Sequence, residues 1–227
     1  MRGKAERFPV KPGMKGERQT GAIGLGGCHR PWRVPSATRR WVNQGGELFT
    51  SKILIKMEFN DVLNRRYSCR AFAAKGVAQE KIDRILAAGR IAPTAVNKQP
   101  VHIWAVSRPE TLEAIKGVTR SNYGAPLLLV VGCRPSEAWG RRYDGKNGAE
   151  VDAAIVSTYL MLAAENEGLA TLWVGSFDPT LLRKILPGAD EYELVAMINI
   201  GYPAADGKPS AMHDTRKPMD ELVTRVD

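Results

Sequence analysis

The 227-residue chain has a composition ordinary for a folded protein, with 44% hydrophobic residues and a formal net charge of +9. Its length allows one sizeable core and an appendage. The longest apolar run, Ala125–Gly132, is the size of a strand and falls far short of the roughly 18 residues that a membrane-spanning helix needs. We therefore expect a soluble protein without a membrane partner.

The positive charge is confined to the first part of the chain. Residues 1–56 hold 12 of the 33 basic and 3 of the 24 acidic residues, which leaves 21 of each kind in the remainder. This segment is rich in Gly, Pro and Arg and lacks a helical or strand period, so we expect a disordered basic extension before a folded domain at 57–227. Either it is a genuine tail or Met57 is the true start.

Nucleic-acid binding through this tail ranks lowest among the functions considered, because no motif that reads DNA or RNA accompanies the charge. The cysteines are widely spaced and odd in number, and neither they nor the histidines have the spacing of metal ligands. These residues are Cys28, Cys69, Cys133, His29, His102 and His213. We therefore expect a cytoplasmic protein with no disulfide framework and no metal site.

From Met57 onwards hydrophobic periodicity predicts alternating helices and strands. The expected helices run from about Phe59 to Arg66 and over Gln79–Ala92, Pro109–Gly117, Val151–Glu167 and Pro179–Ile185. The expected strands cover Val101–Val106, Leu127–Cys133, Thr171–Val174 and Val195–Ile200. The order lacks a βαβ run and a GxGxxG motif, which indicates an α+β fold with one sheet flanked by helices.

The longest expected helix, Val151–Glu167, carries an apolar stripe, and Gly168 is suited to cap its end. The stripe consists of Val151, Ile155, Tyr159, Leu162 and Ala163.

Three segments carry residues suited to ligand binding. In the first, Arg66, Tyr67, Ser68 and Arg70 follow a helix end. Arginine forks bind phosphate in bidentate fashion and a serine hydroxyl adds a donor, so the segment is a candidate anion site. The alternative is a solvated basic helix end that complements its own dipole.

The second segment, residues 93–100 (PTAVNKQP), follows a helix stop and contains Pro93, Thr94, Ala95, Asn97 and Gln99. Asn and Gln supply both donors and acceptors, as needed to read a heterocycle with alternating carbonyl and NH groups, such as the flavin pyrimidine ring. The alternative is a turn in which these amides satisfy the local backbone.

In the third segment, Trp173 and Val174 end a strand at Gly175. A glycine there lets the main chain approach a planar ligand closely, and its backbone N–H is suited to donate to flavin N5. Strand-to-helix turns with glycine also occur without a ligand.

Together these segments resemble the FMN-dependent nitroreductase family. Residues 66–72 (RYSCRAF) resemble its RxSxRxF element, residues 93–100 its P-S-S-x-N-x-Q-P loop, and residues 168–177 (GLATLWVGSF) its GLGTxWxGxF run. Residues 216–222 (RKPMDEL) resemble its C-terminal RKPLDEL, in which Arg216 reaches back to the flavin phosphate. The four motifs occur in the family's order, with departures at Tyr67, Thr94, Ala95 and Val101.

The resemblance implies a nitroreductase-like mixed sheet and a homodimer with the long helix at the interface and two FMN sites built from both chains. It places Pro93, Thr94 and Ala95 on the flavin of the other subunit, and Trp139–Lys146 is a candidate lid. The implied activity is ping-pong hydride transfer from NADH or NADPH through FMN to a nitroaromatic, quinone or related acceptor, without a catalytic triad. The alternative is a flavin-binding or sensing protein that does not turn over.

Overall fold

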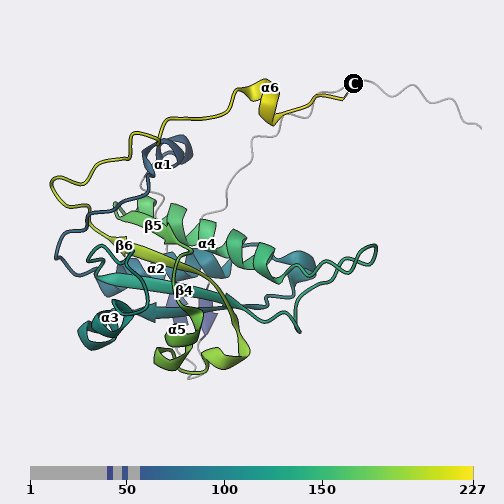
Figure 1. Ribbon diagram of the computed structural model, residues 1–227, viewed down its shortest axis with the longest axis horizontal. Helices are drawn as coiled ribbons and strands as arrows, with labels where there is room; N and C mark the ends of the chain where they lie inside the picture. Colours follow the sequence, from purple (N-terminus) through teal and green to yellow (C-terminus); the bar gives the residue numbers. More distant parts are fainter. Residues whose placement is uncertain (1–39, 43–47, 51–56, 227) are drawn as a thin grey trace, which may run out of the picture. The chain divides into compact units, whose positions relative to one another are not determined.

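The computed structural model describes residues 40–42, 48–50 and 57–226 (Figure 1). Most of residues 1–56, with Cys28 and His29, lies outside the described residues, so the disordered extension stays a prediction. Two short strands within that stretch, β1 (Arg40–Val42) and β2 (Leu48–Thr50), pair in antiparallel fashion. The sequence pattern did not predict this pair.

Four strands form the main sheet in the order β3-β4-β6-β5. Their bounds are Val101–Val106 for β3, Leu127–Cys133 for β4, Ala170–Val174 for β5 and Glu193–Gly201 for β6. All three pairings in the sheet are antiparallel, and a parallel pairing occurs in the isolated bridge between Ser68 and Thr171. The expected α+β class is confirmed, whereas the four-stranded sheet itself is antiparallel and not mixed.

The central strand β4 is buried along its whole length and divides the core in two. Because neighbouring side chains of a strand point to opposite faces, Leu127, Leu129 and Val131 join one buried cluster, and Leu128 and Val130 join the other. The first cluster lies against α2 (Gln79–Arg90) and α4 (Ala149–Asn166), the second against α3 (Pro109–Ile115) and α5 (Pro179–Ile185). Figure 1 shows the sheet between these two helical layers.

Most helix and strand bounds fall within two residues of those predicted. The remaining helices are α1 (Phe59–Arg65), α6 (Met219–Leu222) and the 3-10 turns η1 (Ala95–Asn97) and η2 (Ala189–Glu191). Helix α2 ends at Arg90, two residues before the expected end, and Ile91 is 47% exposed beyond it. The two residues before Pro93 therefore belong to the turn, since proline disfavours helical backbone in the residue that precedes it.

Helix α4 buries one stripe of side chains against the core and leaves the apolar stripe named above partly exposed. Ala153, Val156 and Leu160 face the sheet and are buried, whereas Val151 is 52% and Tyr159 is 38% exposed. The helix is apolar on nearly all sides, so periodicity alone does not tell which side faces inward. The expected stripe is thus a partly exposed apolar face in the single chain.

Glycine permits two features around α4. Gly168, at φ +72°, follows the helix in the left-handed conformation expected of a cap. Gly89 lies under Leu160, where an added Cβ would come within 2.6 Å of that side chain. Helices α2 and α4 therefore pack closely at Gly89.

None of the helices in the described part of the chain combines the length and the hydropathy that a membrane crossing requires.

The pair between α2 and the end of α4 generates a prediction. Arg84 donates two hydrogen bonds, of 2.9 and 2.8 Å, to Glu167, whose side chain is 3% exposed. Arg84→Ala leaves a buried carboxylate without this partner, so the free energy of unfolding should fall by about 3 kcal/mol in urea titration. Arg141→Ala, in the exposed pair with Asp144, should change it by less than about 1 kcal/mol. Similar losses in both variants would contradict this account.

Candidate functional site

The segment of residues 66–72 connects α1 to the sheet. The Cys69 amide donates to the carbonyl of Thr171 at 2.9 Å, beside the Ser68–Thr171 bridge. On its other side, Phe72 bridges to Pro203 and the Ala73 amide donates to the Tyr202 carbonyl. The segment is therefore held between the start of β5 and the chain that leaves β6.

Two of the predicted motifs are brought together here. Ser68 pairs with Thr171, and the strand continues from there through Trp173 and Val174 to Gly175. Gly175 lies four positions after Thr171, a span of about 13 Å along an extended chain. An elongated ligand with an anionic end suits this arrangement, because Arg66 and Ser68, both half-buried, lie at one end and Gly175 at the other.

The surroundings of Ser68 include a polar atom without a partner. The hydroxyl of Thr171, a residue only 1% exposed, has no hydrogen-bond partner in the structure. Arg70 is exposed, and its guanidinium donates to the Ser68 carbonyl at 3.3 Å. Two arginines and a serine hydroxyl thus lie in a segment that pairs with the start of β5, and this composition fits an anion-binding site better than a plain helix end.

The turn after β5 opens onto a cleft. A Cβ at Gly175 would meet nothing within 4 Å, so the space beside its backbone is open. A cleft of about 670 Å³ lies next to it, lined by residues 116–121 and 176–178. This volume is within the range of small-molecule sites. The Thr119 hydroxyl donates to the Ser176 carbonyl at 2.7 Å and joins the two walls.

The loop Pro93–Pro100 contains strained backbone. Val96, Asn97 and Gln99 have φ of 44°, 56° and 53°, and residues other than glycine rarely adopt this conformation. Such strain concentrates at functional sites. The Gln99 side-chain amide donates to the Asn97 carbonyl at 3.3 Å, so one of its donors serves the local backbone, as the turn interpretation predicts.

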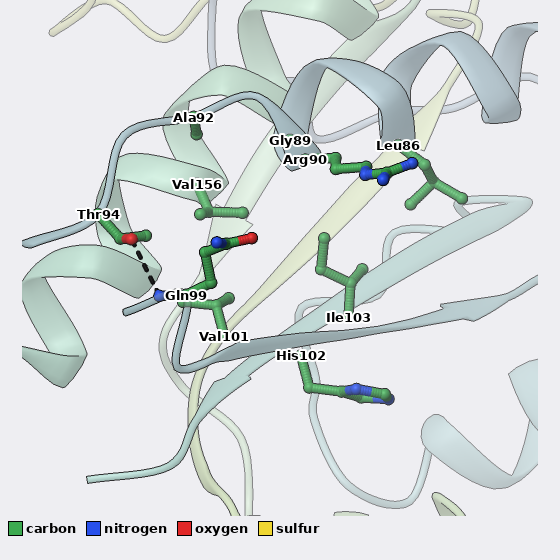
Figure 2. A pocket seen from close by; sticks show the side chains of 10 residues that line it. All are labelled: Leu86, Gly89, Arg90, Ala92, Thr94, Gln99, Val101, His102, Ile103 and Val156. Atoms are coloured by element: carbon green, nitrogen blue, oxygen red, sulfur yellow. Dashed lines mark hydrogen bonds between the residues drawn. The ribbon is translucent and has the colours of Figure 1, made fainter. Parts of the chain in front are cut away.

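In the single chain this loop forms the wall of a separate cavity. Figure 2 shows Gln99 and Ile103 pointing toward Val156 and the end of α2, while His102 points to the opposite side of β3. The cavity measures about 270 Å³. Its lining comprises Leu86, Gly89, Arg90, Ala92, Thr94, Gln99, Val101, His102, Ile103 and Val156.

Arg216 lies apart from the 66–72 segment in its contacts. Its guanidinium donates to the carbonyls of His213 and Thr215, in its own exposed stretch of chain. An earlier part of the same stretch reaches the candidate site, since the Tyr67 hydroxyl donates to the Gly207 carbonyl at 3.4 Å. The His213 ring also lies 6.4 Å from the Tyr67 ring. The expected meeting of Arg66, Ser68 and Arg216 at one phosphate stays a prediction.

Charged groups near Arg66 perturb one another. Burial raises the pKa of Tyr67 to about 12, with further contributions from Cys69 and Glu165, so the phenol keeps its proton. Burial also raises the pKa of Glu165, against the opposing charges of Arg65 and Arg66. Arg65 lies 3.8 Å from this carboxylate. Glu165 thus pairs with Arg65 and contributes negative charge close to Arg66.

The other residues singled out in the sequence have surroundings that indicate no ligand or chemistry. His102 packs against Trp104 and Tyr192, and burial and the charge of Arg134 lower its pKa. The described cysteines, Cys69 and Cys133, are buried and unbridged. Within the residues that the structure describes, no group of three or more potential metal ligands is found. The candidate lid is a hairpin closed by a bridge between Gly140 and Asn147.

With this geometry in view, the profile of the nitroreductase family matches residues 63–123 and 120–202. The chain belongs to the nitroreductase family. A protein of Methanothermobacter thermautotrophicus, named provisionally as an NADH dehydrogenase/NAD(P)H nitroreductase, is 30% identical over 66% of this chain and 79% of its own length. Human iodotyrosine deiodinase 1 is 22% identical over 78% of this chain and 72% of its own.

Solved structures agree with this assignment. A nitroreductase family protein of Clostridium difficile, 33% identical, superposes with a TM-score of 0.68 over 74% of this chain and 98% of its own. A nitroreductase of Exiguobacterium sibiricum, whose assignment is likewise provisional, was solved in complex with FMN. It is 18% identical to this chain and superposes with a TM-score of 0.65 over 75% of this chain and 98% of its own. The expected nitroreductase-like fold is confirmed.

None of the sequence motifs covers the cleft wall at residues 116–121. These residues include two basic side chains, Lys116 and Arg120, and lie in a loop between α3 and β4. No local pattern marks them, because long-range hydrogen bonds bring them to the turn after β5. The Thr119 hydroxyl donates to the Ser176 carbonyl across 57 residues of sequence, and the Asp178 amide donates to the Val118 carbonyl.

Glu165 gives a pH-dependence prediction. A carboxyl whose pKa is raised by folding stabilises the folded state fully below its ordinary pKa of 4.5, and this contribution is lost as the pH rises. Glu165→Gln, which mimics the protonated acid, should therefore match the wild type in melting temperature near pH 4 and exceed it increasingly toward pH 7. Thermal melts across this range test it. If the melting temperature of the wild type instead rises relative to that of the variant with increasing pH, the attraction of Arg65 and Arg66 for the Glu165 carboxylate outweighs the cost of burying it.

Proposed function

We propose that this chain is an FMN-dependent oxidoreductase that uses NADH or NADPH to reduce a nitroaromatic, a quinone or a related electrophile in a ping-pong reaction. The observation that carries the proposal is the pairing of Ser68 with Thr171, which unites an arginine-rich segment with the strand that ends at Gly175. Membership of the nitroreductase family and the FMN complex of the Exiguobacterium relative support it. A cytoplasmic location also stays a prediction.

The residues present fit FMN. The anionic end requires cationic and hydroxyl donors, which Arg66, Ser68 and Arg70 supply in the segment paired with the start of β5. The planar end requires main chain that can be approached closely, and the open space beside Gly175 meets this need. When bound, FMN supplies the hydride-accepting and hydride-donating chemistry.

The protein's own tasks are to bind, to orient and to exclude water. Arg66 and Ser68 would hold the phosphate, and the backbone N–H near Gly175 would face flavin N5. Trp173 and Val174, packed into the two core clusters, fix the strand that presents this N–H. The amides of Asn97 and Gln99 would read the pyrimidine edge. This division needs neither a metal nor a side-chain nucleophile.

The loop and the arginine segment would meet through a second copy of the chain. In one chain, the loop bearing Asn97 and Gln99 lines its own cavity next to α4, and the apolar face of α4 with Val151 and Tyr159 is partly exposed. A homodimer formed on that face would bury these side chains. It would also carry Pro93, Thr94 and Ala95 to the flavin of the other subunit, as the family resemblance implies.

The deciding experiment is a visible spectrum of the purified full-length protein before and after anaerobic addition of NADH or NADPH. We expect a yellow protein that releases FMN on denaturation and loses its flavin absorbance with one or both nucleotides. Steady-state assays with a nitroaromatic, a quinone and an iodotyrosine should then give parallel double-reciprocal lines. Bound FMN that neither nucleotide reduces would favour the non-turnover alternative, and failure to bind FMN would refute the proposal.

Arg66 provides a second prediction. A hydrogen bond from a charged donor contributes about 1.5–3 kcal/mol, so Arg66→Ala should weaken FMN binding by about 10- to 150-fold. Riboflavin has no phosphate, so its affinity should hardly change. Titrating both flavins into the apoprotein measures the two affinities.

The neighbouring arginine is a matched control for this experiment. Arg65 is 3.8 Å from Glu165 and 64% exposed in its side chain, so Arg65→Ala should affect FMN and riboflavin alike. Arg216→Ala, made alongside, tests whether the C-terminal arginine of either chain reaches the phosphate. Equal losses of FMN and riboflavin affinity in the Arg66 variant would contradict the phosphate assignment.

A further inference from the structure

The strained loop is tied to the long helix by one buried carboxylate. Oδ1 of Asp152, in the first turn of α4, accepts a hydrogen bond of 2.9 Å from the backbone N–H of Ala95. Of the loop's other described hydrogen bonds, Asn97 N–H to the Thr94 carbonyl and Gln99 N–H to the Thr94 hydroxyl stay within the loop. The carboxylate is thus a tie between the loop and the rest of the fold.

Packing does not account for Asp152. The residue is 2% exposed, and its second oxygen, Oδ2, is buried without a hydrogen-bond partner in the structure. A buried carboxylate oxygen without a partner lowers stability. The N-terminal end of the α4 dipole compensates part of this cost. What the carboxylate gains is the bond to Ala95.

The hydrogen bond from Ala95 to Asp152 lies next to the strained backbone of residues 96–99. Val96, Asn97 and Gln99 all have positive φ, and such a conformation persists only where the surroundings determine it. Ala95 directly precedes these residues and is the first residue of η1. One helical turn after Asp152, Val156 lines the same cavity as Thr94 and Gln99. Helix α4 therefore fixes both the start of the loop and the surface that faces it.

We propose that Asp152 is a positioning residue that holds the loop of residues 94–99 in its strained conformation and thereby presents Asn97 and Gln99 to the flavin ring. This inference rests on the proposed function for its ligand, though not for the loop geometry itself. Asp152 acts through the Ala95 amide and touches neither cofactor nor substrate. Its contribution is preorganisation, since a loop already in its bound conformation loses less entropy on binding.

Four variants of the full chain test the proposal. Asp152→Ala removes the acceptor, and Asp152→Asn keeps an acceptor oxygen of the same reach while removing the charge. Ala95→Pro removes the donor from the other side, and the extended backbone of Thr94 (φ −129°, ψ 156°) is one that a residue before proline adopts. Ser157→Ala is the matched control, because its hydroxyl is buried on the same helix without a hydrogen-bond partner.

The first readout needs no cofactor. In the apoprotein, backbone amide exchange in residues 96–99 should accelerate about 10-fold or more in Asp152→Ala and in Ala95→Pro. It should remain as in the wild type in Asp152→Asn and Ser157→Ala. A protein with both Asp152→Ala and Ala95→Pro should resemble each of these single variants, since each substitution removes the same hydrogen bond. Should Asp152→Ala fail to fold, Ala95→Pro and Asp152→Asn still decide the question.

The second readout is flavin affinity. Asp152→Ala and Ala95→Pro should weaken FMN and riboflavin equally, by about 10-fold or more, because the loop would contact the ring and not the phosphate. Asp152→Asn should restore the affinity. Amide exchange at the wild-type rate in Asp152→Ala and Ala95→Pro would overturn the inference. An equal loss of flavin affinity in Asp152→Asn and Asp152→Ala would also overturn it, because the charge and not the hydrogen bond would then matter. If the wild type binds no flavin, the proposed function fails while the exchange result stands.

Discussion

Helix α4 is the element on which the rest of the structure depends. Ala153, Val156 and Leu160 cover one face of the sheet, and Leu160 packs into the space that Gly89 leaves on α2. A larger residue at Gly89 would push these helices apart, so their close approach rests on the absence of one side chain. Both helices therefore share a tightly packed core with the sheet.

Much of this fold could be predicted from the sequence. The bounds of β3 and β4 were predicted to the residue, because each is a short run of apolar and β-branched residues bounded by polar or turn residues. The orientation of α4 could not be predicted, since a helix that is apolar on nearly all sides has no polar face to mark its exposed side. Its buried polar residues Asp152 and Glu165 escaped notice for the same reason.

The candidate site was predicted in part. The motifs around Ser68 and Thr171 were recognised from sequence, and the structure brings those two residues together. The positive φ of Val96 had no signal in the sequence, since a β-branched residue in that conformation contradicts its own preference. The local hydrogen bonds of Gln99 and Arg216 were equally hidden, because the order of motifs along a chain does not tell which partners their side chains take.

The two ends of α4 hold the two parts of the candidate site. Asp152, in its first turn, ties the loop that bears Asn97, and Glu165, near its last residue, pairs with Arg65 beside the proposed phosphate ligand Arg66. Helix polarity favours a carboxylate at the first position and disfavours one at the second, where burial also raises the pKa of Glu165.

The exposed apolar face of this same helix is the surface that we propose a second subunit covers. A dimer on α4 would then order both halves of a site that a single chain leaves apart. Because binding free energies are linked reciprocally, flavin binding would then strengthen the dimer by the same factor by which dimerisation strengthens flavin binding.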